Sequence, residues 1–123
     1  MEETEERKPT LEDYARYFKV VCNPQRLAIV LILYASEVLG GSKALRLTQI
    51  VEVLGIPKAG TGTLSNYLNI LTEADFIRKD DGERKNPLYH IGKTGLEFLI
   101  EFGLTEKLDA KIMEMRQKLE VEG

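Results

Sequence analysis

Hydrophobic residues recur at intervals of three and four along the first third of the chain, and this spacing predicts two helices. The first covers residues 10–21, with Thr10 as its N-cap, because a threonine hydroxyl can accept a free N–H group of the first turn. Asn23 followed by Pro24 is typical of a second helix start, since proline is tolerated at the first helical position. This second helix is expected to reach Leu39, and its apolar middle predicts the central helix of a small bundle.

The middle of the chain predicts a short helix and a longer one, separated by a loop. The short helix covers residues 48–54, with Thr48 as its N-cap and Gly55 as its C-terminal stop. The longer helix covers residues 61–74, and its apolar residues share one face: Leu64, Tyr67, Leu68 and Leu71. Its opposite face is polar and consists of Ser65, Asn66, Asn69 and Glu73.

The last third of the chain predicts two strands followed by two helices. Segments 76–79 and 88–91 suit strands, and the polar, turn-forming residues between them indicate a β-hairpin with a charged tip. Helices are expected at residues 94–102 and 105–121. Four apolar residues of the last helix have the spacing of a coiled-coil seam: Leu108, Ile112, Met115 and Leu119.

These elements predict one mainly α domain with a small β-hairpin. Residues 1–9 are expected to form an acidic disordered arm, residues 10–103 the main domain, and residues 104–123 a C-terminal dimerisation helix of the same domain. The hydrophobic content of 43% suffices for one modest core. The charged first residues lack the apolar segment of a secretory signal, and the longest apolar run is too short to span a membrane. We therefore expect a cytoplasmic protein without membrane association.

Charge is distributed unevenly along the chain, whose net charge is −3. This net charge argues mildly against nucleic-acid binding, because DNA-binding domains usually present a basic surface to the phosphates. However, residues 14–93 carry eleven bases and seven acids, whereas residues 1–13 carry six acids and two bases. Residues 94–123 carry seven acids and four bases. The centre of the chain is thus mildly basic and remains compatible with DNA.

Four strings, in this order, resemble segments of the ArsR-like transcriptional repressors: YFKVVCNPQRL at 17–27, LSNYLNIL at 64–71, ADFIRK at 74–79 and IGKTGL at 91–96. The resemblance covers about residues 14–100 and implies a winged helix-turn-helix fold, in agreement with the order of the predicted elements. It also implies a homodimeric DNA-binding regulator, most often a repressor. The turn before residue 64 is longer than the family's turn, and segment 48–54 lacks the paired cysteines of metal-sensing members.

The candidate DNA-binding residues lie on the polar face of helix 61–74, in the preceding loop and on the hairpin. Short polar side chains such as asparagine can contact base edges in the major groove, whereas basic and hydroxyl side chains can contact phosphates. The candidates are Lys58, Thr61, Thr63, Ser65, Asn66, Asn69, Arg78, Lys79, Arg84 and Lys85. The alternative interpretation is that each of these side chains is solvated and binds no ligand. Tyr67, by contrast, is expected to face the core.

The terminal helices are expected to pair two subunits, because the central helices already cover each other's apolar faces. The candidate interface residues are Leu11, Tyr14, Phe18, Leu108, Ile112, Met115 and Leu119. Packing of the last helix within its own chain is the alternative. A dimer of this type would read half-sites whose centres lie about 10 base pairs apart.

Two alternatives to a DNA-binding regulator follow from the same residues. A winged helix that serves protein–protein interaction fits the acidic ends, whereas an enzyme is not expected, because no cluster of residues has catalytic spacing. His90 is expected to be structural or exposed. Cys22 is expected to be a small buried hydrophobe, with a redox switch across a dimer as the alternative. No metal or other cofactor is expected, and the sequence does not identify an effector.

Overall fold

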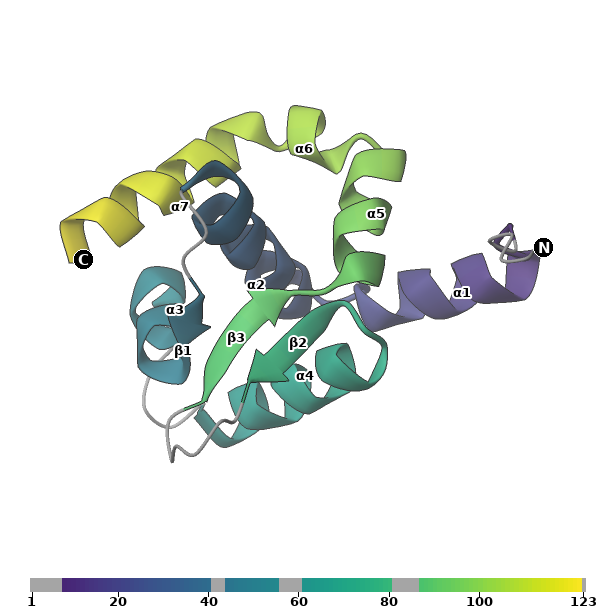
Figure 1. Cartoon of the computed structure of the whole chain (residues 1–123), viewed down its shortest axis with the longest axis horizontal. Coiled ribbons are helices and arrows are strands. Elements are labelled where there is room, and N and C mark those ends of the chain that lie inside the picture. Colours follow the sequence, from purple (N-terminus) through teal and green to yellow (C-terminus); the bar gives the residue numbers. More distant parts are fainter. Residues whose placement is uncertain (1–7, 41–43, 56–60, 81–86, 123) are drawn as a thin grey trace.

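The structure, a computed structural model, describes residues 8–40, 44–55, 61–80 and 87–122 (Figure 1). The chain is mainly helical and contains a small antiparallel sheet, which confirms the predicted class. In chain order its elements are α1 (Leu11–Val20), α2 (Pro24–Tyr34), the π-helical segment η1 (Ala35–Leu39), β1 (Leu45–Arg46), α3 (Leu47–Leu54), α4 (Thr61–Glu73), β2 (Ile77–Asp80), β3 (Leu88–Ile91), α5 (Lys93–Glu101), α6 (Leu104–Lys107) and α7 (Asp109–Glu122).

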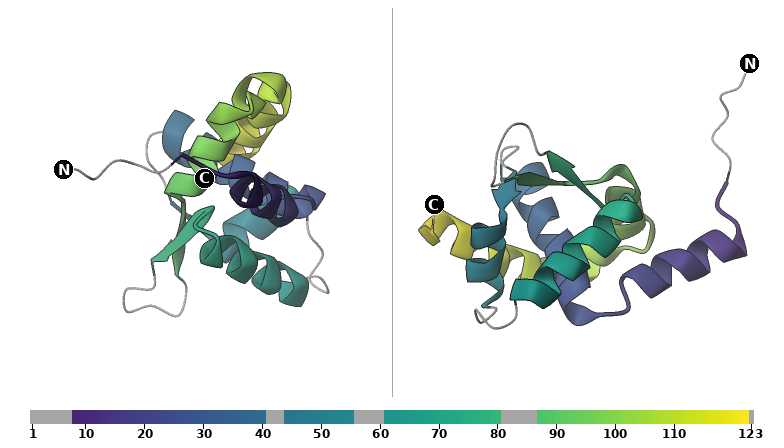
Figure 2. Two further views of the ribbon diagram at one scale, coloured as in Figure 1. Left: turned by 90° about the vertical axis from the view of Figure 1, so that its right-hand side faces the viewer. Right: turned by 90° about the horizontal axis from the view of Figure 1, so that it is seen from below.

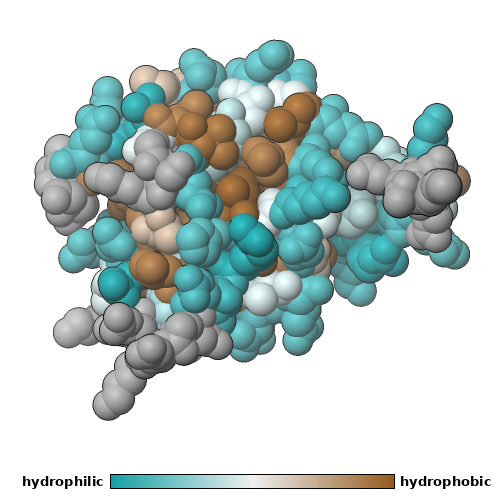
Figure 3. Space-filling model, in the orientation of Figure 1, coloured by the Kyte–Doolittle hydropathy of each residue, from teal (hydrophilic) through white to brown (hydrophobic). Residues whose placement is uncertain are grey.

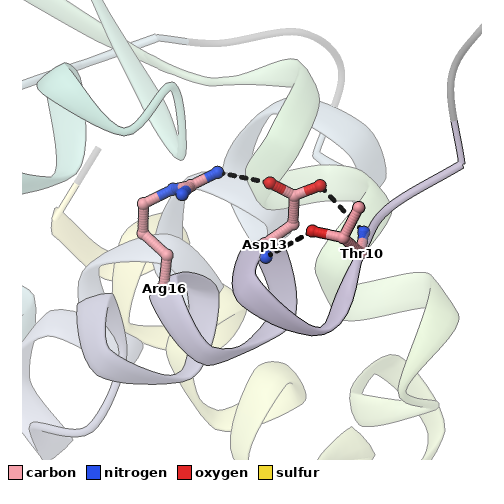
Figure 4. Close-up of polar contacts among 3 residues, drawn as sticks. All are labelled: Thr10, Asp13 and Arg16. Carbon is pink, nitrogen blue, oxygen red and sulfur yellow. Dashed lines mark hydrogen bonds and ion pairs between the residues drawn. The ribbon is translucent and has the colours of Figure 1, made fainter.

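Helix α1 begins at the predicted residue because its first turn is closed by a capping box (Figure 4). The Asp13 backbone N–H donates to the Thr10 hydroxyl over 3.1 Å, and the Thr10 N–H donates to the Asp13 carboxylate over 2.9 Å. Arg16, one turn later, forms an ion pair with the same carboxylate. The hydrogen bond from the Thr10 backbone N–H is the main reason why the pKa of Asp13 lies below its ordinary value. The nearby Arg16 guanidinium lowers this pKa further.

Helix α2 is the centre of the fold, as its apolar composition predicts. It begins at Pro24, and the Asn23 side chain accepts hydrogen bonds from the N–H groups of Gln25 and Arg26 over 2.8 and 3.0 Å. The residues from Ile29 to Leu33 are all buried. The helix then continues into η1, a wider π-helical turn that the sequence did not reveal.

The sheet has three antiparallel strands in the order β1-β3-β2, whereas the sequence predicted the pairing of only two of them, the hairpin of β2 and β3. In the added strand, Leu45 lies opposite Tyr89 of β3. This strand leads directly into α3, whose first residue is Leu47. The prediction of Thr48 as the cap was wrong, because the Gln49 side chain instead accepts the N–H of Arg46 over 2.9 Å.

The last predicted helix is divided into α6 and α7 at Leu108. Within α7, the side chains of Ile112 and Met115 are 1% and 3% exposed. They belong to the main core of their own chain, where α7 packs on η1, α2 and α3. The prediction that these two residues pair with a second subunit was therefore wrong, because α2 and α3 leave an apolar surface that α7 covers. Leu108 and Leu119 are half-buried against the same core.

Helices α4 and α7 lie on opposite sides of the molecule, and α1 extends from the body (Figures 1 and 2). A cluster of aromatic rings connects α1 with α5 and with the start of β2, with ring centroids 4.9 to 6.2 Å apart: Tyr14, Tyr17, Phe18, Phe76, Phe98 and Phe102. Among the described residues, no single helix has the length and apolar character to cross a membrane. Only α1 taken together with Pro24–Leu39, a pair bent by 94°, meets these criteria of length and composition.

Candidate nucleic-acid interface

Helix α4 has the two faces that the sequence predicted. Its apolar side is closed, since Leu64, Leu68 and Leu71 are at most 2% exposed. The side chains on the opposite side are all exposed to solvent: Thr63, Ser65, Asn66, Asn69 and Glu73. Hydroxyl and amide groups along one exposed helix face can donate and accept hydrogen bonds at the edges of base pairs.

The first half of α4 is anchored to the corner between α1 and α2. The Asn23 side-chain amide donates to the Tyr67 hydroxyl over 3.1 Å. The Arg26 guanidinium lies 5.2 Å from the centroid of the Tyr67 ring, and its Nε donates to the Val20 carbonyl over 2.6 Å. Tyr67 is half-buried and packs against the core, as predicted. Asn23 and Arg26 thus position α4 through Tyr67, a role that the sequence alone did not predict.

The segment that follows α4 packs against the first turn of α5 and forms a hydrogen bond with it. Asp75 adopts a positive φ of 62°, and its carboxylate accepts a hydrogen bond from the Thr94 hydroxyl over 3.1 Å. Gly92 and Gly95 lie directly against this turn, where a Cβ atom would collide with the backbone oxygens of Asp75 and Phe76. The strings at 74–79 and 91–96 therefore pack against each other, and together they hold the exit of α4.

The sheet beside α4 carries basic side chains on its edge strand. Arg78 and Lys79 of β2 are exposed, and together with Asp80 and His90 they line an open hollow of about 290 Å³. His90 Nδ1 lies 2.7 Å from the Glu37 carboxylate, whose second oxygen accepts the N–H of Ile91 over 2.5 Å. The π-helical segment η1 thus holds β3 in place through Glu37. This contact gives His90 a structural role, as expected.

The structure positions only part of the predicted DNA-binding set. Six of the candidates are exposed on α4 and on the adjacent strand β2: Thr63, Ser65, Asn66, Asn69, Arg78 and Lys79. Lys58, Arg84, Lys85 and the side chain of Thr61 lie outside the described residues. Helix α4 itself contains no lysine or arginine, so its exposed face offers mainly uncharged hydroxyl and amide groups. Attraction of this helix to a phosphate backbone would therefore require basic side chains from neighbouring elements.

The predicted dimer residues on α1 differ in exposure. Leu11 is 87% exposed and Phe18 is 47% exposed, whereas Tyr14 is half-buried and donates its hydroxyl to Glu101 of α5. Cys22 was expected to be buried but is exposed, because it lies in the turn between α1 and α2, outside the packed faces of both helices. Its thiol contacts the Lys19 carbonyl over 3.1 Å.

The described part of the chain contains no group of three or more His, Cys, Asp or Glu side chains that could hold a metal ion. Comparisons of the sequence with known protein families and with curated proteins, and of the fold with solved structures, find no match. The candidate interface is therefore defined by its own geometry.

Proposed function

We propose that the chain is a winged helix-turn-helix regulator that binds specific sequences in double-stranded DNA. The observation that carries this proposal is the exposed polar face of α4, which holds Ser65, Asn66 and Asn69. In this interpretation α3 and α4 are the two helices of the motif, α4 enters the major groove, and β2 and β3 form the base of the wing. The two anchors of α4, at Tyr67 and Asp75, support a rigid recognition helix.

We further propose that the regulator acts as a homodimer through α1 and α5. Exposed apolar side chains on these helices support such an interface: Leu11, Phe18 and Ile100. The aromatic cluster, to which Phe18 itself belongs, fixes α1 against its own chain, so that the helix can present Leu11 and the exposed part of Phe18 to a second copy. Repression by occupation of a promoter is the expected mode of action.

Selection of bound duplexes from a random DNA pool tests the proposal and yields the preferred site. Asn69→Ala should then weaken binding to that site by about 1–3 kcal/mol and relax the preference for the base it contacts. Arg78→Ala should weaken binding to all duplexes and reduce the salt dependence by about one unit. Gln117→Ala on α7, which is also exposed, serves as the control and should leave binding unchanged.

A module for protein–protein interaction is the rival function, and one observation favours it. Hydrophobic surface gathers on the side formed by α7 and α5 (Figure 3), where the exposed apolar residues of η1, α5 and α7 are Val38, Leu39, Ile100 and Met113. Absence of salt-dependent binding to any duplex would refute the DNA proposal. In that case this apolar side would become the primary candidate for function.

A further inference from the structure

A groove of about 260 Å³ lies between the start of α2, the end of α3 and α7, and its lining residues come from these three helices. Its apolar lining comes from all three helices and includes Ala28, Val53, Leu54 and Met115. Charged side chains of α7 stand at the same groove: Lys111, Glu114 and Lys118. The groove therefore combines an apolar surface with a charged group at one side, as small-molecule sites commonly do.

The charged side of the groove carries an excess of positive charge. Lys111 Nζ lies 3.5 Å and Lys118 Nζ 3.6 Å from the two carboxylate oxygens of Glu114. Both distances exceed the roughly 2.7–2.9 Å of a strong charge-assisted hydrogen bond. Two ammonium groups thus share one carboxylate in loose contacts, and each remains about half exposed, at 55% and 52%. An incoming anion can bind both lysines without breaking a tight ion pair.

We propose that this groove binds a small amphipathic carboxylate, with its apolar body on the α2–α3 side and its carboxylate against the exposed ammonium groups of Lys111 and Lys118. The volume lies slightly below the range of about 300–1,000 Å³ that is usual for ligand sites, so the ligand is small. The apolar body would cover Ala28, Val53 and Leu54. The single negative charge would complement the one positive charge that Glu114 leaves unbalanced.

The position of the groove makes this ligand a candidate effector. Val53 and Leu54 form the last turn of α3, which Gly55 ends in a left-handed conformation with φ of 69°. A ligand that packs on these two residues contacts the end of the helix that precedes α4 in the chain. The effector role rests on the proposed function, whereas occupancy of the groove does not.

Titration of the ¹⁵N-labelled full chain with octanoate, followed by amide NMR spectra, tests the proposal without DNA. Shifts should concentrate on the amides of Ala28, Val53, Leu54 and Met115. Octanamide, which has the same alkyl tail as octanoate but no charge, should bind more weakly. Lys111→Gln and Lys118→Gln should each weaken octanoate binding roughly two- to fivefold. Glu114→Gln should strengthen octanoate binding by a similar factor. Lys107→Gln on α6 is the matched control and should have no effect.

The opposite effects of the lysine and glutamate variants distinguish a binding site from a merely structural cluster. These side chains are about half exposed, so the variants are expected to fold. Shifts confined to Val38, Leu39 and Met113, or equal affinity of octanoate and octanamide, would overturn the proposal. If octanoate binds in the groove while no duplex binds the protein, the carboxylate site stands, whereas the DNA function fails together with the effector role that rests on it.

Discussion

The anchor between the α1–α2 corner and α4 leads to a prediction that a double-mutant cycle can measure. Asn23 has two roles, because its oxygen caps α2 while its amide donates to the Tyr67 hydroxyl. Loss of an N-cap costs about 1 kcal/mol, and loss of a hydrogen bond between partly buried groups also costs about 1 kcal/mol. Asn23→Ala should therefore lower the free energy of unfolding by about 2 kcal/mol, and Tyr67→Phe by about 1 kcal/mol.

The double variant decides whether the two residues act together. Because the shared hydrogen bond can be lost only once, Asn23→Ala with Tyr67→Phe should cost about 2 kcal/mol, which gives a coupling energy near 1 kcal/mol. Urea unfolding at one protein concentration measures all four free energies. Asn69→Ala, on the exposed face of α4, is the control and should stay within about 0.5 kcal/mol of the wild type. Strictly additive effects, with about 3 kcal/mol in the double variant, would refute the anchor.

Three further predictions concern the core, the α4 exit and the first helix. Ile112→Ala should lower the free energy of unfolding by about 2–5 kcal/mol in urea, because the side chain is buried, whereas Gln117→Ala, at an exposed position of the same helix, should change it by less than about 0.5 kcal/mol. Gly92→Ala should reduce the melting temperature, since its Cβ would collide with the Asp75 carbonyl; an unchanged value would contradict this packing. The pKa of Asp13 is lowered in the folded state, so its contribution to stability is present above the ordinary value near 4 and is lost as pH falls through the folded pKa. Asp13→Asn should reduce this acid sensitivity in unfolding curves recorded between about pH 6 and 2, and an identical pH profile would exclude a role for Asp13.

Features that depend on near neighbours in the chain could be predicted from the amino-acid sequence. The starts of α1 and α2 were predictable because Thr10 and Asn23 satisfy backbone N–H groups only two or three residues away. The two faces of α4 were predictable for a similar reason, since helical geometry alone places Leu64, Leu68 and Leu71 on one side. Local chemistry therefore sufficed for much of the candidate interface.

Which surfaces pack against each other could be seen only in the folded chain. The spacing of α7 suits a seam between subunits as well as a core position, and the surface left by α2, η1 and α3 decided in favour of the core. The pairing of β1 with β3 and the hydrogen bond of Asn23 to Tyr67 join residues about forty positions apart. The exposure of Cys22 likewise depends on how α1 leaves the body. Such contacts form only when distant segments close together, and no pattern within one segment encodes that closure.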